Sequence, residues 1–115
     1  MTSTDLKKGS AELLILSLVE RVPRHGYELG KLIESRSRGA VRFNVGSLYP
    51  LLYRLEKRGW LKSDWGASEA NQRAKYYRLT AAGKAQLSRE RDRWSQLVDA
   101  IGRIMNPAPA RKESR

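Results

Sequence analysis

The feature that most constrains the fold of this chain is a stripe of four leucines, Leu48, Leu51, Leu52 and Leu55. Their spacing of three and four residues puts all four side chains on one face of an α-helix. Asn44 before the stripe is a favourable N-cap residue, and Gly59 after it is a common helix stop. We therefore expect a helix from Val45 to Lys57, with one face buried and the other free.

The free face of this predicted helix changes in character along its length. Gly46, Pro50, Tyr53 and Lys57 lie opposite the leucines, with Arg54 beside them. This face therefore carries small side chains near the start of the helix, and aromatic and basic side chains further along. Pro50 is anomalous, because proline inside a helix removes one backbone hydrogen bond.

Tyr49 has two interpretations. It lies about 100° from the leucine stripe. Periodicity alone therefore leaves open whether it is a residue at the edge of the core or part of the free face.

Two shorter helices are expected before this one. The first spans Ala11–Glu20, is capped by Ser10, carries Glu12 in its first turn, and ends before Pro23. It is apolar on nearly every side, which is typical of a buried helix. The second spans Tyr27–Ser35, starts from Gly26, and presents Leu29, Leu32 and Ile33 on one side.

A β-hairpin is expected next. Trp60–Trp65 and Lys75–Leu79 are rich in strand-forming residues, and the stretch Gly66–Ala74 between them is polar and turn-like. We interpret Trp60 and Trp65 as packing residues of this hairpin.

The last predicted element is a long helix that begins at Thr80 and ends at Asn106. Leu87, Trp94 and Ile101 are seven residues apart, as are Leu97 and Ile104, which is typical of a helix that pairs with another helix. We expect this stripe, with Leu13 of the first helix, to form a dimer interface made of Leu13, Leu87, Trp94, Leu97, Val98, Ile101, Ile104 and Met105.

The order of elements is three helices, a hairpin and a long helix, which predicts a mainly α fold with a small β-hairpin. This is the layout of a winged helix-turn-helix with a C-terminal dimerisation helix. We divide the chain into a winged-helix domain at residues 1–79, the dimerisation helix at residues 80–106 and a disordered tail at residues 107–115.

The chain is strongly basic. Its 23 Lys and Arg residues exceed its 12 Asp and Glu residues, which gives a net charge of +11 over 115 residues. Phosphate backbones and anionic membrane surfaces are the two obvious partners for such a charge. No apolar run is long enough to span a bilayer and the N-terminus lacks a signal sequence, so we expect a cytoplasmic protein without a membrane partner.

Seven of the basic residues fall in the stretch from Arg36 to Lys62, where Glu56 is the single acid. The positive charge is therefore concentrated locally, in and around the predicted helix from Val45 to Lys57. In a helix-turn-helix the second helix of the motif enters the major groove by its N-terminal end. We therefore expect double-stranded DNA to contact Arg42, Asn44, Gly46, Ser47, Tyr49, Pro50, Tyr53, Arg54, Lys57, Arg73 and Lys75.

Other classes of function fit the sequence less well. The chain has no Cys, its one His is His25, and its acids form no recognisable acid–base or metal-binding spacing, so we expect neither an enzyme nor a metal or other cofactor. A basic amphipathic helix could lie on a membrane, but the seven-residue spacing fits a partner helix better. RNA binding needs a larger platform of stacking aromatic residues, although Tyr76 and Tyr77 keep that alternative open.

Helix 45–57 and its flanks also resemble a known family. The runs Gly46-Ser47-Leu48-Tyr49-Pro50-Leu51-Leu52 and Arg54-Leu55-Glu56-Lys57-Arg58-Gly59-Trp60 look like the signature of PadR-family transcriptional regulators. The stretches Leu13–Leu18, His25–Leu29 and Arg73–Thr80 with Gly83 agree with it in order and spacing. The resemblance covers roughly Ala11 to Leu87, and the single last helix is similar to the short-tailed branch of the family.

The resemblance implies a winged helix that dimerises through its last helix and represses a promoter. It implies that Tyr49 is part of the recognition helix, and that Pro50 belongs to the same motif. A sequence-specific repressor that acts as a homodimer on an inverted-repeat operator is therefore expected.

The family also implies an effector in some members. Some bind small aromatic molecules near the dimer interface, at sites that include a tryptophan on the last helix, and Trp94 is the candidate here. We favour the simpler interpretation that Trp94 packs in the dimer core.

Overall fold

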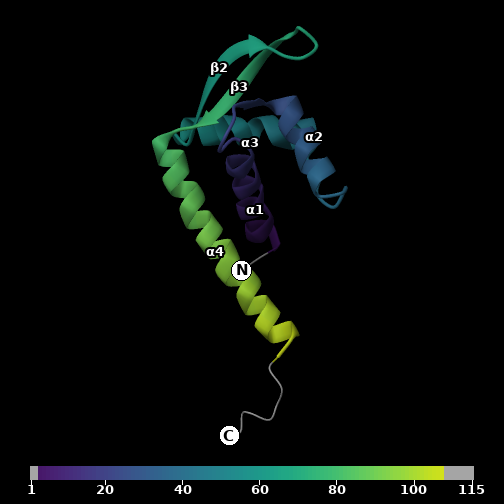
Figure 1. Ribbon diagram of the computed structural model, residues 1–115, viewed down its shortest axis with the longest axis vertical. Coiled ribbons are helices and arrows are strands. Elements are labelled where there is room, and N and C mark those ends of the chain that lie inside the picture. Colours follow the sequence, from purple (N-terminus) through teal and green to yellow (C-terminus); the bar gives the residue numbers. More distant parts are fainter. Residues whose placement is uncertain (1–2, 108–115) are drawn as a thin grey trace, which may run out of the picture.

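The computed structural model describes the backbone of residues 3–107 and the side chains of residues 10–107. In chain order its elements are α1 (Ser3–Leu18), β1 (Arg24–His25), α2 (Gly26–Arg36), α3 (Val45–Lys57), β2 (Leu61–Ala67), β3 (Arg73–Leu79) and α4 (Ala81–Met105). Figure 1 shows the β2–β3 hairpin above the three shorter helices, with α4 leading away from them. The predicted fold class is confirmed: the protein is mainly α with a small β-hairpin, arranged as a winged helix.

The first helix is longer than its apolar pattern indicated. It begins at Ser3 and not at Ala11, so Ser10 lies inside it and is not its N-cap. It ends at Leu18, two residues before the predicted Glu20. Hydrophobic periodicity marks the part of a helix that packs, and the polar segment before it can be helical without adding to that pattern.

The sheet has one strand more than predicted. Its order is β1-β3-β2, and β1 pairs antiparallel with β3 through Arg24 opposite Tyr77 and His25 opposite Tyr76. A two-residue strand is too short to show any periodicity in the sequence.

The hairpin strands are shifted and extended relative to the prediction. The pairing runs from Leu61 opposite Leu79 out to Ala67 opposite Arg73, so the connecting loop shrinks to residues 68–72. Asn71 takes a positive φ of 58° in this loop, a conformation that Asn tolerates better than most residues.

The core lies between α1, α2, α3 and the sheet. All four leucines of the stripe on α3 are buried in it, together with Ile15, Leu16, Leu29 and Tyr77. Leu87 of α4 also belongs to this core and is 2% exposed within a single chain. Leu87 therefore has almost no exposed surface for a partner chain to contact. We remove it from the dimer interface that the heptad spacing predicted.

The connection between α3 and α4 is fixed by a close backbone contact. The backbone N–H of Thr80 donates to the Trp60 carbonyl at 3.1 Å, and the Thr80 hydroxyl oxygen accepts from the Gly83 N–H at 3.0 Å as the predicted N-cap of α4. A Cβ on Gly83 would lie 2.1 Å from the Trp60 carbonyl oxygen. This contact sets the position from which α4 leaves the domain.

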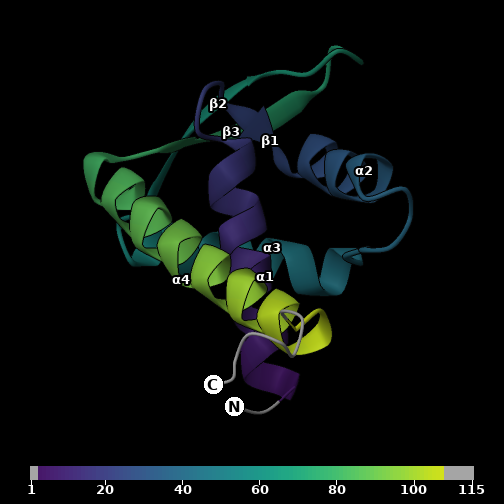
Figure 2. The same ribbon diagram turned by 60° about the horizontal axis from the view of Figure 1, so that its bottom comes forward.

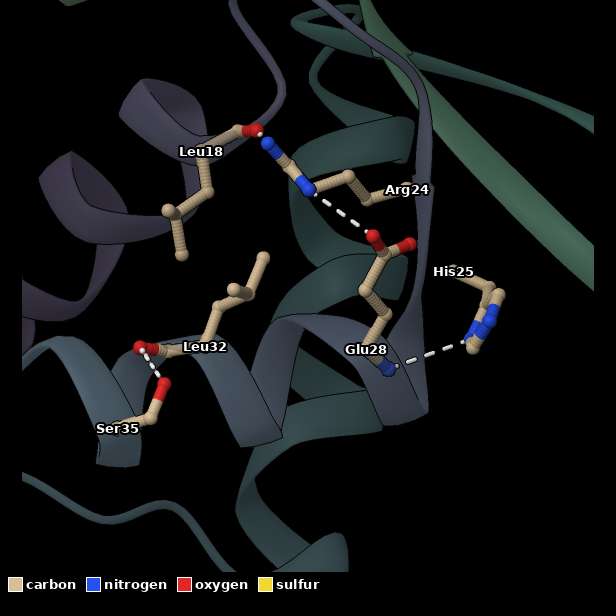
Figure 3. A network of polar contacts seen from close by, with 6 residues as sticks. All are labelled: Leu18, Arg24, His25, Glu28, Leu32 and Ser35. Carbon is tan, nitrogen blue, oxygen red and sulfur yellow. Dashed lines mark hydrogen bonds and ion pairs between the residues drawn. The ribbon is translucent and has the colours of Figure 1, made fainter. Parts of the chain in front are cut away.

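The start of α2 is fixed by side chains that the pattern of leucines does not reveal. Figure 3 shows Arg24 donating to the Leu18 carbonyl at 2.6 Å and to a Glu28 carboxylate oxygen at 2.9 Å, which ties the end of α1 to α2. The N-cap of α2 is His25, whose Nδ1 accepts from the Glu28 N–H at 3.2 Å. The helix therefore begins at Gly26, the residue from which the sequence predicted it to start, and ends at Arg36, one residue beyond the predicted Ser35.

Helix α4 runs beside α1 and then beyond it (Figures 1 and 2). Near the end of α1, Arg91 donates to both carboxylate oxygens of Glu20, at 2.7 and 3.2 Å. From Arg91 to Met105, α4 has no buried residue in a single chain, although Trp94, Val98 and Ile101 lie on it. Of the predicted disordered tail, residues 108–115 lie outside the described part of the chain.

Candidate nucleic-acid interface

The N-terminus of α3 is exposed and capped as predicted. Asn44 has extended backbone angles, and its side-chain oxygen accepts from the Ser47 N–H at 2.9 Å. Gly46 and Ser47 in the first turn are exposed. The remaining backbone amides of this turn carry the positive end of the helix dipole, which favours an anion such as a phosphate.

Pro50 lies within α3, and the helix runs from Val45 to Lys57 around it. Its missing N–H falls in the second turn, on the exposed side. Further along the same side, the Lys57 ammonium lies 5.6 Å from the centre of the exposed Tyr53 ring. From its N-terminus onward, the outer face of α3 therefore exposes first the backbone of its first turn, then the Tyr53 ring and the Lys57 ammonium.

Tyr49 joins two elements. Its side chain is 43% exposed, so it is not a core residue. Its ring lies against the backbone of Gly26 at the start of α2, so closely that a Cβ on Gly26 would be 2.5 Å from the ring. The periodicity did not decide whether Tyr49 lies at the edge of the core or on the free face. In the structure it lies at the edge of the core, with part of its surface exposed.

The hairpin presents Arg73 and Trp65 next to each other. The Arg73 guanidinium lies 4.2 Å from the centre of the Trp65 ring, an attractive cation–π geometry. Trp65 is 59% exposed, so our interpretation of it as a packing residue is wrong, whereas Trp60 does pack against the core. Trp65 lies on the same side of β2 as the buried Leu61, but nearer the tip of the hairpin, where the core no longer covers that side.

Glu56 holds the hairpin to α3. One of its carboxylate oxygens accepts from the Ser63 hydroxyl at 2.7 Å, and the other lies 3.5 Å from the Lys75 ammonium. The sequence showed Glu56 only as the single acid within a basic stretch. A single acid among seven cations could have indicated that Glu56 holds a neighbouring basic residue in place, as it does with Lys75 of the hairpin.

The basic footprint is on the surface. Seven cations of the stretch 36–62 are exposed: Arg36, Arg38, Arg42, Arg54, Lys57, Arg58 and Lys62. Arg42 lies 3.6 Å from Glu34, and Arg58 lies 3.1 Å from Glu12. In the described part of the chain the other five form no ion pair within 4 Å, so their charges are available to an anionic partner.

The structure brings α3 and the hairpin together at one place. Tyr49, Arg73 and Lys75 border the same cavity, although they are far apart in the sequence. Of the predicted contact residues, Lys75 alone is only partly exposed, because it lies beside Glu56 and Tyr77. Arg42, Tyr53, Arg54 and Lys57 do not border that cavity but are exposed elsewhere in and before α3.

The part of the chain that the structure describes contains neither a cluster of metal ligands nor a membrane-spanning helix. Among the side chains of residues 10–107, no group of three or more His, Asp or Glu is placed to hold a metal ion. None of the described helices is both long and apolar enough to cross a membrane.

A comparison with known protein families identifies the family of this chain. Residues 15–89 match the model of the transcriptional regulator PadR-like family. The chain belongs to the PadR-like family of transcriptional regulators. Members of this family are regulators and not enzymes, which excludes the enzyme alternative for this PadR-like protein.

Solved structures and sequence relatives agree with this assignment. A PadR-like transcriptional regulator from Bacillus cereus is 27% identical, with a TM-score of 0.78 over 90% of this chain and 99% of that one. A transcriptional regulator from Clostridium thermocellum is 30% identical, with a TM-score of 0.76 over 86% of this chain and 96% of that one. The transcriptional regulator Rv3488 of Mycobacterium tuberculosis is 38% identical over 70 residues, which are 61% of this chain and 64% of that protein.

Proposed function

We propose that this PadR-like regulator is a repressor that binds a specific sequence of double-stranded DNA as a homodimer. The observation that carries the proposal is the outer face of α3, which has an exposed, capped N-terminus, the exposed cations Arg54 and Lys57 without an ion pair, and the Arg73 side of the hairpin next to Tyr49. Since its target would be chromosomal DNA, we place the protein in the cytoplasm.

In this proposal α3 enters the major groove by its N-terminal end. Gly46 and Ser47 allow the backbone to approach the duplex, and Tyr49 and Tyr53 donate hydroxyl hydrogen bonds to phosphates or contact thymine methyl groups. Arg42, Arg54 and Lys57 neutralise phosphates, and Arg73 and Lys75 bind the adjacent backbone from the wing.

The proposed homodimer forms through α4. Its second half exposes an apolar stripe that a single chain does not cover, made of Trp94, Val98, Ile101, Ile104 and Met105, with Leu97 partly covered beside it. A second copy offers the same heptad spacing, which is what helix pairing needs. Leu13 of α1 contributes from the side, since it is only partly buried in a single chain. Two-fold symmetry then predicts an inverted-repeat operator whose half-sites are about one helical turn apart, or a multiple of it.

An aromatic effector at Trp94 is a finer part of the proposal. Trp94 is exposed in the single chain and lies on the stripe that would face the second copy. We favour packing in the dimer core for this residue, because a large aromatic side chain at a heptad position is usually buried by its partner.

The test is DNA binding by fluorescence anisotropy at two salt concentrations. The probe is the duplex upstream of this protein's own gene, and scrambled duplex is the competitor. We expect binding that weakens steeply with salt and still prefers the upstream duplex. Equal binding to both duplexes at both salt concentrations would contradict sequence-specific recognition of this site. Binding to neither would contradict the assignment of the DNA surface.

A further inference from the structure

Val45 is an exposed aliphatic residue at the very start of α3. Its side chain is 71% exposed, and in the described part of the chain no other large hydrophobic side chain outside α4 is as exposed. The apolar residues Val41 and Phe43 just before it pack against the core, whereas Val45 does not. Val45 therefore adds little to the packing of the fold, and its aliphatic surface is free for a partner.

The neighbouring side chains limit what this part of α3 can recognise. From Val45 to Tyr53 the helix contains no Arg, Lys, Asn, Gln, Asp or Glu. Asn44 lies just before this stretch, but its side-chain oxygen already accepts from the Ser47 N–H at 2.9 Å. The exposed side of the first two turns therefore offers small and apolar groups, together with the hydroxyls of Ser47 and Tyr49.

The four bases differ in the groups that they present to such a surface in the major groove. Guanine, adenine and cytosine are read mainly by the charged and amide side chains that this stretch lacks, whereas the C5-methyl group of thymine is read by apolar contact. An exposed aliphatic side chain therefore matches thymine better than any other base. Valine is also stiff about χ1, so it loses little conformational freedom when it makes such a contact.

Exposed cations on both sides of Val45 in the sequence supply the attraction for a duplex. Arg42 precedes it, and Arg54 and Lys57 follow it along α3. Arg54 and Lys57 form no ion pair within 4 Å in the described part of the chain, and Arg42 lies 3.6 Å from Glu34. A nucleic acid whose phosphates bind these cations covers the exposed start of α3, so a duplex is the occupant that this surface favours.

We propose that Val45 determines part of the sequence specificity by packing against the C5-methyl group of one thymine in each half-site of the operator. The inference rests on the proposed function, because it requires α3 to enter the major groove by its N-terminal end. Burial of one methyl group changes an affinity by about fourfold, so two half-sites together change it by about ten- to twentyfold.

The first experiment selects binding sites for the full chain from a pool of random-sequence duplexes. We expect the parent chain to enrich an inverted repeat with a strongly preferred thymine in each half-site. Val45→Ala should enrich the same repeat without that preference, because the alanine side chain is too short to cover the methyl group. Val22→Ala is the matched control, since Val22 is also exposed but lies in the turn between α1 and β1, and it should enrich the same repeat as the parent chain.

Uracil, which is thymine without the C5-methyl group, tests the contact itself. Anisotropy titrations compare the selected duplex with one in which uracil replaces the preferred thymine in both half-sites. The parent chain and Val22→Ala should bind the uracil duplex about ten- to twentyfold more weakly than the thymine duplex. Val45→Ala should bind the two duplexes with affinities within about twofold of each other. Circular dichroism confirms that each variant is folded, as expected for changes at exposed side chains.

The outcomes separate this inference from the proposed function. If the parent chain enriches no sequence, the proposed function is wrong and the role of Val45 is overturned with it. If the parent chain enriches a repeat and Val45→Ala keeps the same thymine preference, or distinguishes uracil from thymine as strongly as the parent chain does, sequence-specific binding stands and the role of Val45 alone is overturned. Loss of the preference in Val22→Ala as well would also overturn it, because the effect would then not come from a contact of Val45.

Discussion

Gly26 and Gly83 are the two glycines of the described chain where a side chain would meet other atoms at less than 3 Å. At Gly83 the obstacle is the backbone carbonyl of Trp60, which is itself hydrogen-bonded to Thr80. At Gly26 it is the ring of Tyr49, a side chain that can move. The two positions should therefore respond differently to the same substitution, one in stability and the other in the recognition surface.

Gly83→Ala should lower the free energy of unfolding by about 1–3 kcal/mol, the usual cost of forcing extra atoms into a packed contact. Urea denaturation followed by circular dichroism measures it. Gly30→Ala is the matched control, because its Cβ would make an ordinary 3.5 Å contact with Leu48. That change should stabilise α2 by up to about 1 kcal/mol, and an equal loss in both variants would contradict the specific role of the Trp60 carbonyl.

Gly26→Ala should weaken DNA binding through Tyr49. The new methyl group displaces the Tyr49 ring, so the double variant with Tyr49→Ala should bind DNA no more weakly than Tyr49→Ala alone. Anisotropy titrations of the three variants test this, with circular dichroism to confirm that each is folded. Losses of affinity that simply add would mean that Gly26 acts independently of Tyr49.

Lys57→Ala should also weaken DNA binding, but in a way that depends on salt. If Lys57 contacts a phosphate, its removal lowers the slope of log K against log salt by about 1 and affects all sequences alike. Titrations at several salt concentrations measure the slope. An unchanged slope would remove Lys57 from the proposed interface.

At the scale of elements, the packing of α4 against α1 encloses two carboxylates. Glu12 of α1 is 8% exposed and accepts from Arg58 at 3.1 Å, and Glu90 of α4 is 6% exposed and accepts from Gln86 at 2.7 Å. Burial raises the pKa of Glu90, the Gln86 hydrogen bond opposes that rise, and the nearby Glu12 adds to it. The junction of the two helices is therefore sensitive to pH.

The direction of this dependence follows from the raised pKa. Since folded Glu90 holds its proton more tightly than unfolded Glu90, its contribution to stability is complete below the unfolded pKa near 4.5 and is lost as the pH rises through the higher folded value. Glu90→Gln cannot become charged, so it should raise the melting temperature relative to the parent chain more at pH 8 than at pH 4.5. Thermal melts at the two pH values test this.

Glu69→Gln is the control for that experiment, because it removes an exposed carboxylate from the hairpin loop. It should change the melting temperature little at either pH. A Glu90→Gln variant that gains most at pH 4.5 would show that the charged form of Glu90 is the stabilising one.

At the scale of the whole molecule, the proposed dimer depends on the apolar stripe of α4. Leu97→Asp with Ile101→Asp should leave the chain monomeric, because four like charges would face one another across the interface. Ser88→Asp with Gln96→Asp adds the same charge at exposed polar positions off the stripe and should stay dimeric. Sedimentation velocity compares the pairs of variants, and two dimeric pairs would contradict α4 as the interface.

The sequence by itself determined the elements whose patterns are long and regular. The leucine stripe with Asn44 and Gly59 predicted α3 with its exact bounds, and Thr80 marked the start of α4 correctly. Together with the family signature around Tyr49 and Pro50, these patterns were enough for the fold class and for most of the candidate DNA surface. They succeed because periodicity, caps and stops act within one or two turns of the chain.

Only the tertiary structure decided which residues from different elements meet. It added β1, placed Leu87 in the core of one chain, exposed Trp65 beside Arg73, and gave Glu56 its role in holding the hairpin. It also set Tyr49 against Gly26 and gathered five rings around one cavity. None of these contacts repeats along the chain, because each depends on how the packed helices and the sheet bring distant side chains into reach.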